Sequence, residues 1–222
     1  DGRLRYNIDR KKIKKIIGLR FKKISRRSKY LLFFFNRDIV MLVHLGMTGK
    51  FFFVNRKRKK YKTSFYYDLN EEKDKKHDRI IFDLSNNQKL IYNDIRKFGF
   101  IKFFKRIDLE QNEHLKHLGP EPLSTNFNIE YFKNYIIGKK RSIKDILMDQ
   151  KFLSGVGNIY ANEILFFSGI RPAKKIKNLT DIEIQKIIKF SKKIISQAIT
   201  LGGSSIKDFS SSSGKKGSFQ QH

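Results

Sequence analysis

The hydrophobic residues of this chain follow two different periods, one in each half of the sequence. Up to about residue 104, short runs rich in β-branched and aromatic residues are separated by polar residues, a pattern typical of antiparallel strands. A short helix is predicted over residues 10–17, with Ile13, Ile16 and Ile17 on one face. Strands are predicted over residues 30–35, 39–45, 51–54, 65–69, 79–84, 89–92 and 98–104.

Beyond residue 108 the apolar residues recur at helical spacing. The last helix has the clearest ends, because Thr180 and Glu183 form a capping box and Gly202 and Gly203 follow its final turn. Its buried face is predicted to carry Ile184, Ile187, Ile188, Ile194, Ile195 and Ala198. Helices are predicted over residues 129–137, 142–148, 158–168 and 181–201.

The change of period indicates two domains of different class. Between them lie residues 118–123, whose two prolines end any helix and stiffen the chain. We therefore expect an α+β protein with an antiparallel β-sandwich or barrel over residues 1–104, a linker over 105–125 and a helical domain over 126–222. Residues 56–62 are predicted to form a basic, solvated loop that could also touch a backbone phosphate, and residues 210–217 are predicted to be mobile.

Charge narrows the class of partner. The chain of 222 residues carries 49 Lys and Arg against 21 Asp and Glu, a formal net charge of +28, while 39% hydrophobic residues suffice for a core. The electrostatic field of such a positive charge attracts polyanions, so nucleic acid is the leading candidate for a partner. The alternative is codon bias in an AT-rich genome, which would raise the lysine content of any surface.

Several classes of protein are excluded by what these residues lack. No apolar run reaches about 18 residues and no basic, apolar leader opens the chain, so we expect a soluble, cytoplasmic protein without a membrane span or secretory signal. The absence of cysteine rules out disulfides and thiolate zinc sites in this chain, and the five histidines lack metal-ligand spacing. No metal or cofactor is expected in these residues.

Two groups of residues suggest contacts with a nucleic acid. Gly155 and Gly157 precede a predicted helix headed by Asn158, an arrangement that lets a phosphate approach free backbone amides; the alternative is an ordinary corner between helices. Met47, Arg96 and Phe98 follow predicted strands, and Arg96 and Phe98 share one face if the backbone is extended. An apolar wedge beside a planar donor suits insertion into a base stack. Taken singly, Met47 and Phe98 are more often core residues and Arg96 a surface ion pair.

Five segments together resemble the bacterial formamidopyrimidine-DNA glycosylase family: HLGMTGKF, NDIRKFG, HLGPEPL, MDQKFLSGVGNIYANEILFFSGIRP and GGSSIKDF. That family removes oxidised purines, such as 8-oxoguanine and formamidopyrimidines, from duplex DNA. HLGM together with RKFG favours this branch over the related endonuclease VIII enzymes. The resemblance implies an N-terminal antiparallel β-sandwich and a C-terminal helix-two-turn-helix domain, with the motif itself at residues 142–168.

The resemblance also implies roles for individual residues. Met47, Arg96 and Phe98 would enter the duplex where the damaged nucleotide leaves, with Arg96 facing the orphaned cytosine and Phe98 wedging the stack. Lys29, His44 and Asn158 would hold the flanking phosphates. Backbone amides of a lesion-recognition loop within residues 202–219 would close over the extruded base; the alternative is a disordered tail. The loop amides are those of Ile206, Lys207, Asp208 and Phe209.

The family's catalytic proline and glutamate are absent, since the chain begins at Asp1, and no catalytic residue is assigned. The amine of Asp1 or of Lys29 could assist weak Schiff-base lyase action, but base excision is not expected from this chain alone. The family's C-terminal zinc finger is also absent, although Zn²⁺ is expected in the full-length member. The sequence thus resembles the middle of the enzyme, truncated at both ends.

The resulting hypothesis is a bifunctional DNA glycosylase and abasic-site lyase, monomeric and associated with the nucleoid. The complete protein would bind damaged double-stranded DNA and cleave the abasic strand by β,δ-elimination through an N-terminal proline Schiff base. One alternative is a non-catalytic remnant that still binds damaged DNA. A second is a basic RNA- or ribosome-associated protein, for which Met47, Arg96 and Phe98 would have no purpose.

Overall fold

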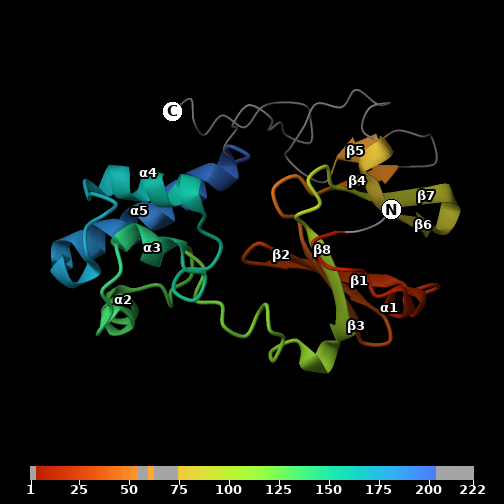
Figure 1. Cartoon of the computed structure of the whole chain (residues 1–222), viewed down its shortest axis with the longest axis horizontal. Helices are drawn as coiled ribbons and strands as arrows, with labels where there is room; N and C mark the ends of the chain where they lie inside the picture. The colour runs from red at the N-terminus through yellow and green to blue at the C-terminus, as the bar shows by residue number, and fades with distance from the viewer. Residues whose placement is uncertain (1–3, 55–59, 63–74, 204–222) are drawn as a thin grey trace. The chain divides into compact units, whose positions relative to one another are not determined.

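The protein is described by a computed structural model that covers residues 4–54, 60–62 and 75–203 (Figure 1). It divides into two compact units. One contains the chain up to Leu109 together with the residues from Leu201, and the other is Glu110–Thr200. The division falls within the predicted linker, and residues 110–125 group with the helical unit.

The first unit is built from two four-stranded antiparallel sheets. One sheet has the order β1 (Phe21–Arg27), β2 (Tyr30–Phe35), β3 (Ile39–His44) and β8 (Phe100–Lys105). The other has the order β5 (Lys60–Lys62), β4 (Lys50–Val54), β7 (Gln88–Asn93) and β6 (Asp78–Leu84). Short 3-10 turns lie at Lys75–His77, Ser85–Asn87 and Arg106–Asp108.

The core of this unit is shared by both sheets. The rings of Phe33 on β2 and Phe51 on β4 lie 5.4 Å apart, so side chains of the two sheets interdigitate. Strand β3 is a central strand, and its four inner residues are all buried. The prediction of an α+β protein with an antiparallel β-sandwich is therefore confirmed. The buried cluster contains Leu4, Ile16, Phe33, Phe35, Met41, Val43, Phe51, Leu90, Tyr92, Ile101 and Phe103.

Several predicted boundaries in the first unit are wrong. Strands β1 and β5 were not predicted, and β5 falls in the segment expected to be a loop. Helix α1 is shorter than predicted, Arg10–Lys14, and Ile17 is 75% exposed because it lies in the turn after the helix. Phe98 precedes β8 instead of beginning it. The strand predicted at residues 65–69 lies outside the described residues.

The second unit contains α2 (Ile129–Ile136), α3 (Ile143–Met148), α4 (Asn158–Ser168) and α5 (Asp181–Thr200), with a 3-10 turn at Ile176–Asn178. The predicted capping box of α5 is confirmed: the Thr180 amide donates to Glu183 Oε2 at 2.8 Å, and the Glu183 amide donates to Thr180 Oγ1 at 3.3 Å. The predicted apolar face of α5 is buried apart from Ile195, which is half-buried.

Aromatic rings make up one part of the core of the second unit. Phe152 follows α3, and its ring contacts the rings of Tyr131 and Tyr135 on α2, at centroid distances of 5.7 and 4.8 Å. Phe127 and Phe132 complete the cluster. The turn after α3 is thereby fixed against α2. Among the described residues, no helix is long and apolar enough to cross a membrane.

Candidate nucleic-acid interface

Met47, Arg96 and Phe98 are presented by two loops of the first unit. Met47 lies between β3 and β4, and Arg96 and Phe98 lie between β7 and β8. All three side chains are exposed, Met47 by 59% and Phe98 by 45%. None of the three is therefore a core residue, which was the alternative for the two apolar ones.

Arg96 and Phe98 form a pair. The guanidinium carbon of Arg96 lies 4.6 Å from the centroid of the Phe98 ring, within the range of a cation–π contact. The backbone between them is not extended, because Lys97 has a positive φ of 59°. The two side chains thus meet through a turn, and the premise of an extended backbone is wrong.

The two loops touch each other at Gly46. This residue has a φ of 64°, and a Cβ atom placed on it would lie 2.6 Å from the carbonyl carbon of Phe98. Only glycine allows so close an approach between the backbones. Met47 is therefore held next to the segment that carries Arg96 and Phe98.

Hydrogen bonds to a buried carboxylate join the same two loops. Asp94 has no exposed surface, and it accepts hydrogen bonds from the Thr48 hydroxyl and, at 2.9 Å, from the Gly99 amide. The Tyr92 hydroxyl donates to Asp94 Oδ2 at 3.3 Å. Burial and the neighbouring Asp94 raise the pKa of Tyr92 far above its usual value, so the hydroxyl remains a donor.

His44 and Lys29 lie at the same end of the first sheet as these loops. Tyr30 pairs with His44 and His44 pairs with Phe100, so Lys29, Gly46 and Gly99 all lie just beyond the strands at one end of this sheet. His44 Nδ1 accepts a hydrogen bond from the Gly46 amide at 3.0 Å. A neutral imidazole that accepts at Nδ1 carries its proton on Nε2.

Lys29 lies in the turn between β1 and β2, where Ser28 has a positive φ of 55°. The residue is exposed as a whole, yet partial burial lowers the pKa of its amine below the usual value for lysine. A negatively charged partner would favour the charged form of this amine.

Asn158 is the first residue of α4 in the second unit, and it is exposed. Gly157 occupies the N-cap position and has no side chain that could cap the helix amides. Gly155, two residues earlier, has a φ of 92°, so the chain turns sharply before the helix. The arrangement has the features expected of a phosphate contact: an exposed carboxamide beside a helix N-terminus.

Gln150 fixes this turn from inside. Its Oε1 accepts a hydrogen bond from the Gly155 amide at 2.8 Å, and its Nε2 donates to the Val156 carbonyl at 2.8 Å. Its own carbonyl accepts from the Gly119 amide at 2.9 Å. The Ser154 amide donates to the Pro120 carbonyl at 2.9 Å, which explains why part of the predicted linker belongs to the helical unit.

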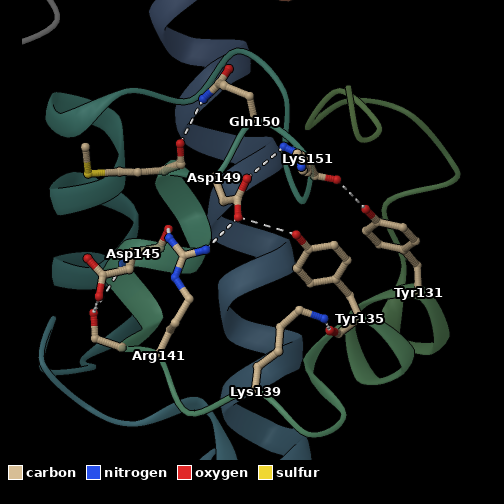
Figure 2. A network of polar contacts seen from close by, with 10 residues as sticks. Tyr131, Tyr135, Lys139, Arg141, Asp145, Asp149, Gln150 and Lys151 are labelled. Carbon is tan, nitrogen blue, oxygen red and sulfur yellow. Dashed lines mark hydrogen bonds and ion pairs between the residues drawn. The ribbon is translucent and has the colours of Figure 1, made fainter. Parts of the chain in front are cut away.

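A second network surrounds Asp149, as Figure 2 shows. Asp149 Oδ2 lies 2.6 Å from Arg141 and accepts a hydrogen bond from the Tyr135 hydroxyl at 3.5 Å, while Oδ1 accepts from the Lys151 amide at 3.0 Å. Burial opposes ionisation of Asp149, but the Lys151 amide and Arg141 outweigh it and lower its pKa. Tyr131 donates to the Phe152 carbonyl at 2.8 Å.

The structure places the predicted residues in two groups. Lys29, His44, Met47, Arg96 and Phe98 lie together in the first unit, and Asn158 lies in the second. The predicted lesion-loop residues Ile206 to Phe209 lie outside the described residues. Sequence reasoning missed Thr48, Asp94, Asp149 and Gln150, although each is adjacent or close to a residue that it singled out.

No metal centre emerges from the part of the chain that the structure describes. No group of three or more His, Asp or Glu residues there could hold an ion. The full chain also contains no cysteine. The described residues therefore do not fit the zinc ion that the resemblance implies for the full-length protein.

Comparison with known proteins places this geometry in context. The formamidopyrimidine-DNA glycosylase N-terminal domain matches residues 1–101, and the formamidopyrimidine-DNA glycosylase H2TH domain matches residues 118–210. The formamidopyrimidine-DNA glycosylase of Rickettsia felis is 42% identical over 98% of this chain and 74% of its own length. That of Rickettsia massiliae is 41% identical over 98% of this chain and 73% of its own length.

Solved structures give the same result. The MutM (Fpg) protein of Thermus thermophilus matches with a TM-score of 0.75 and 30% identity, over 92% of this chain and 70% of its own. Lactococcus lactis Fpg in complex with DNA containing an abasic site matches with a TM-score of 0.79 and 30% identity, over 95% and 73%. On the strength of both domains and these relatives, the chain belongs to the formamidopyrimidine-DNA glycosylase family.

Proposed function

We propose that this protein recognises oxidised purines in duplex DNA and that the complete protein excises them and cleaves the resulting abasic strand. Membership of the family supports the general activity, DNA glycosylase action in base-excision repair. The exposed group formed by Met47, Arg96 and Phe98 supports the finer assignment. The G226P mutant of Lactococcus lactis FPG, 31% identical, is described in complex with DNA that contains Fapy-dG.

The proposed role of the group is to stabilise the DNA after the damaged nucleotide has left the stack. Extruding a base costs a few kcal/mol of lost stacking and pairing. The Phe98 ring would replace the lost stacking, and the Arg96 guanidinium would donate hydrogen bonds to the orphaned cytosine. Met47 would fill apolar space on the other side of the gap, where its flexible thioether suits an irregular surface.

The remaining predicted residues would hold the DNA backbone. We assign Lys29 and His44 to phosphates close to the lesion, because both lie at the end of the first sheet where the loops with Met47, Arg96 and Phe98 are found. Asn158 and the first amides of α4 would hold a further phosphate. Such contacts position the protein without reading sequence. The amides of Ile206 to Phe209 would close over the extruded base.

The chemical step proposed for the complete protein uses a secondary amine at the N-terminus. An N-terminal proline would attack the anomeric carbon of the nucleotide, form an iminium and release the base. The iminium makes the adjacent sugar proton acidic, so β- and then δ-elimination would break the flanking phosphate bonds. None of the residues described above is given the role of nucleophile.

The single observation that carries this proposal is the Arg96–Phe98 pair, exposed and in contact with the Met47 loop. The test is a binding titration of the 222-residue chain at matched salt. The ligands are a duplex with an abasic site opposite cytosine, the same duplex undamaged, and a structured RNA. We expect the abasic duplex to bind most tightly.

Equal or tighter binding of the structured RNA would contradict the proposal and favour a basic RNA-binding protein. Borohydride trapping on 8-oxoguanine DNA tests the chemistry separately. A covalent complex with the complete protein is expected. Intact binding without any covalent complex would leave a DNA-binding protein that lacks the excision step.

A further inference from the structure

We propose that Thr48 and Asp94 are positioning residues for base insertion: they lock the Met47 loop and the Arg96–Phe98 loop in one geometry before DNA binds. This inference rests on the proposed role of the three exposed side chains. Neither Thr48 nor Asp94 is exposed, so neither is placed to touch the nucleic acid itself. Their effect would be transmitted through the backbone of the two loops.

Asp94 is the centre of this arrangement. Its carboxylate is fully buried, and burial of a charge is costly unless hydrogen bonds compensate for it. One oxygen accepts from the Thr48 hydroxyl, and the other accepts from the Gly99 amide and the Tyr92 hydroxyl. The Arg79 Nε also donates to the backbone carbonyl of Asp94 at 2.9 Å, which fixes the main chain of this residue.

Thr48 connects the two loops through one atom. Its Oγ1 donates to Asp94 and accepts a hydrogen bond from the Arg96 amide at 3.0 Å. The Arg96 amide begins the segment that carries the wedge, and the Gly99 amide ends it. Thr48, from the loop that carries Met47, holds the first. Asp94, from the same loop as Gly99, holds the second and is itself bonded to Thr48, so residues 96–99 are closed at both ends and joined to the Met47 loop through Thr48.

Besides the hydrogen bonds of Thr48 and Asp94, a backbone contact at Gly46 holds the two loops together. The Gly46 backbone lies against the Phe98 backbone, so any side chain there would push the two loops apart. The hydrogen bonds and this steric contact involve different atoms. They can therefore be disturbed independently, which provides two separate routes to the same test.

The functional reason for such a lock is preorganisation. The free energy of binding becomes less favourable for every side chain and loop that must be ordered when side chains insert into the DNA. A wedge that is already fixed in the free protein avoids this loss. Contacts with phosphates do not depend on it, so the lock should affect discrimination between damaged and intact DNA much more than overall affinity.

The first test is Thr48→Val, which keeps the shape of the side chain and removes the hydroxyl. The probe is a duplex with an abasic site and 2-aminopurine beside the opposite base, whose fluorescence reports unstacking when side chains insert. Loss of hydrogen bonds at a buried site predicts a fall of roughly tenfold in the preference for the abasic duplex over the intact one. Affinity for the intact duplex should be unchanged.

Two control variants separate a positioning role of Thr48 from a general effect on stability. Thr48→Ser retains the hydroxyl and should show the same preference for the abasic duplex and the same fluorescence change as the wild type. Thr200→Val removes an exposed hydroxyl at the end of α5 and should alter neither. Gly46→Ala should reproduce the effect of Thr48→Val although the Thr48 hydroxyl is retained, and circular dichroism checks that each variant is folded.

Each outcome decides a different question. If the wild type shows no preference for the abasic duplex and no fluorescence change, the proposed function fails. If the wild type shows both and folded Thr48→Val and Gly46→Ala also retain both, only the positioning role fails. Loss of both signals in Thr48→Ser as well would equally overturn the role assigned to the hydroxyl.

Discussion

The Arg96 guanidinium rests on the Phe98 ring although Lys97, between them, turns the backbone into the left-handed region. A positive φ is unfavourable for a residue with a Cβ atom, so the surrounding loop must hold this conformation. The two side chains contact each other within a single loop. A wedge and a hydrogen-bond donor are therefore delivered together, as one unit.

Replacing Arg96 should reduce discrimination of the base opposite the lesion. Arg96→Ala removes the donors that would recognise the orphaned cytosine, at a cost of about 1–3 kcal/mol for that base pair. The measurement is cleavage of 8-oxoguanine paired with each of the four bases by the complete protein. Arg106→Ala, which removes the same charge from an exposed position outside the two loops, serves as the control. Equal cleavage of all four pairs before and after the change in Arg96 would refute the assignment.

Replacing Phe98 should weaken binding to damaged DNA specifically. A stacked aromatic side chain contributes about 1–3 kcal/mol per base, so Phe98→Ala should lower affinity for an abasic duplex roughly tenfold or more. Fluorescence anisotropy with abasic and intact duplexes measures the difference. Phe166→Ala removes another exposed ring, 79% exposed on α4, and should leave both affinities unchanged.

Asn158→Ala should weaken binding to the same extent for every DNA sequence. A carboxamide that contacts a phosphate holds the backbone and reads no base edges. Titrations with several duplexes of different sequence provide the measurement, and Asn178→Ala, at an exposed position outside α4, is the control. A loss confined to some sequences would contradict a phosphate contact.

Gln150→Ala should destabilise the protein and weaken DNA binding through the same turn. Its amide group satisfies the Gly155 amide and the Val156 carbonyl, and leaving such groups unpaired costs about 1–3 kcal/mol. Urea unfolding measures the first effect. The second is measured by a double-mutant cycle with Asn158→Ala, in which strict additivity would show that Gln150 does not act through Asn158.

Lowering the pH should destabilise the wild type more steeply than Asp149→Asn. The pKa of Asp149 is lower in the folded chain than its ordinary value of 3.8, so its contribution is present above that value and is lost as pH falls through the folded pKa. The free energy of unfolding, followed from about pH 5 down to about pH 2, is the measurement. Asp83→Asn, at an exposed surface pair with Lys89, should leave the slope as in the wild type. Parallel curves for wild type and Asp149→Asn would contradict the predicted linkage.

Much of the fold could be predicted because its signals are local. The ends of α4, Asn158 and Ser168, and the capping box at Thr180 follow from residues within one or two turns. Strand β1 was missed because it is an edge strand, FKKISRR, whose side chains are mostly exposed and carry no alternating pattern. The apolar residues of this strand pair lie mainly on its partner β2, whose sequence is YLLFFF.

Some residues of the candidate site could likewise be predicted from local sequence, and others could not. Met47, Arg96, Phe98 and Asn158 could be singled out from short motifs, since each lies near a glycine at the end of an element. Asp94 could not, because its side-chain partner Thr48 lies on another loop, 46 residues away. Gln150 could not, because the Gly119 amide, 31 residues away, donates to its backbone carbonyl, a bond that no side-chain pattern indicates. A buried polar side chain that joins distant loops leaves no period in the sequence. Its role becomes visible only when the loops are seen together.

The exposure of Phe98 has a practical consequence, because the chain contains no tryptophan. Phe98→Trp would introduce a solitary indole at the tip of the Arg96–Phe98 loop, with no other indole emission to subtract. Its spectrum would shift when the ring passes from water into the DNA stack, so the kinetics of insertion could be followed from the protein side, on unmodified DNA.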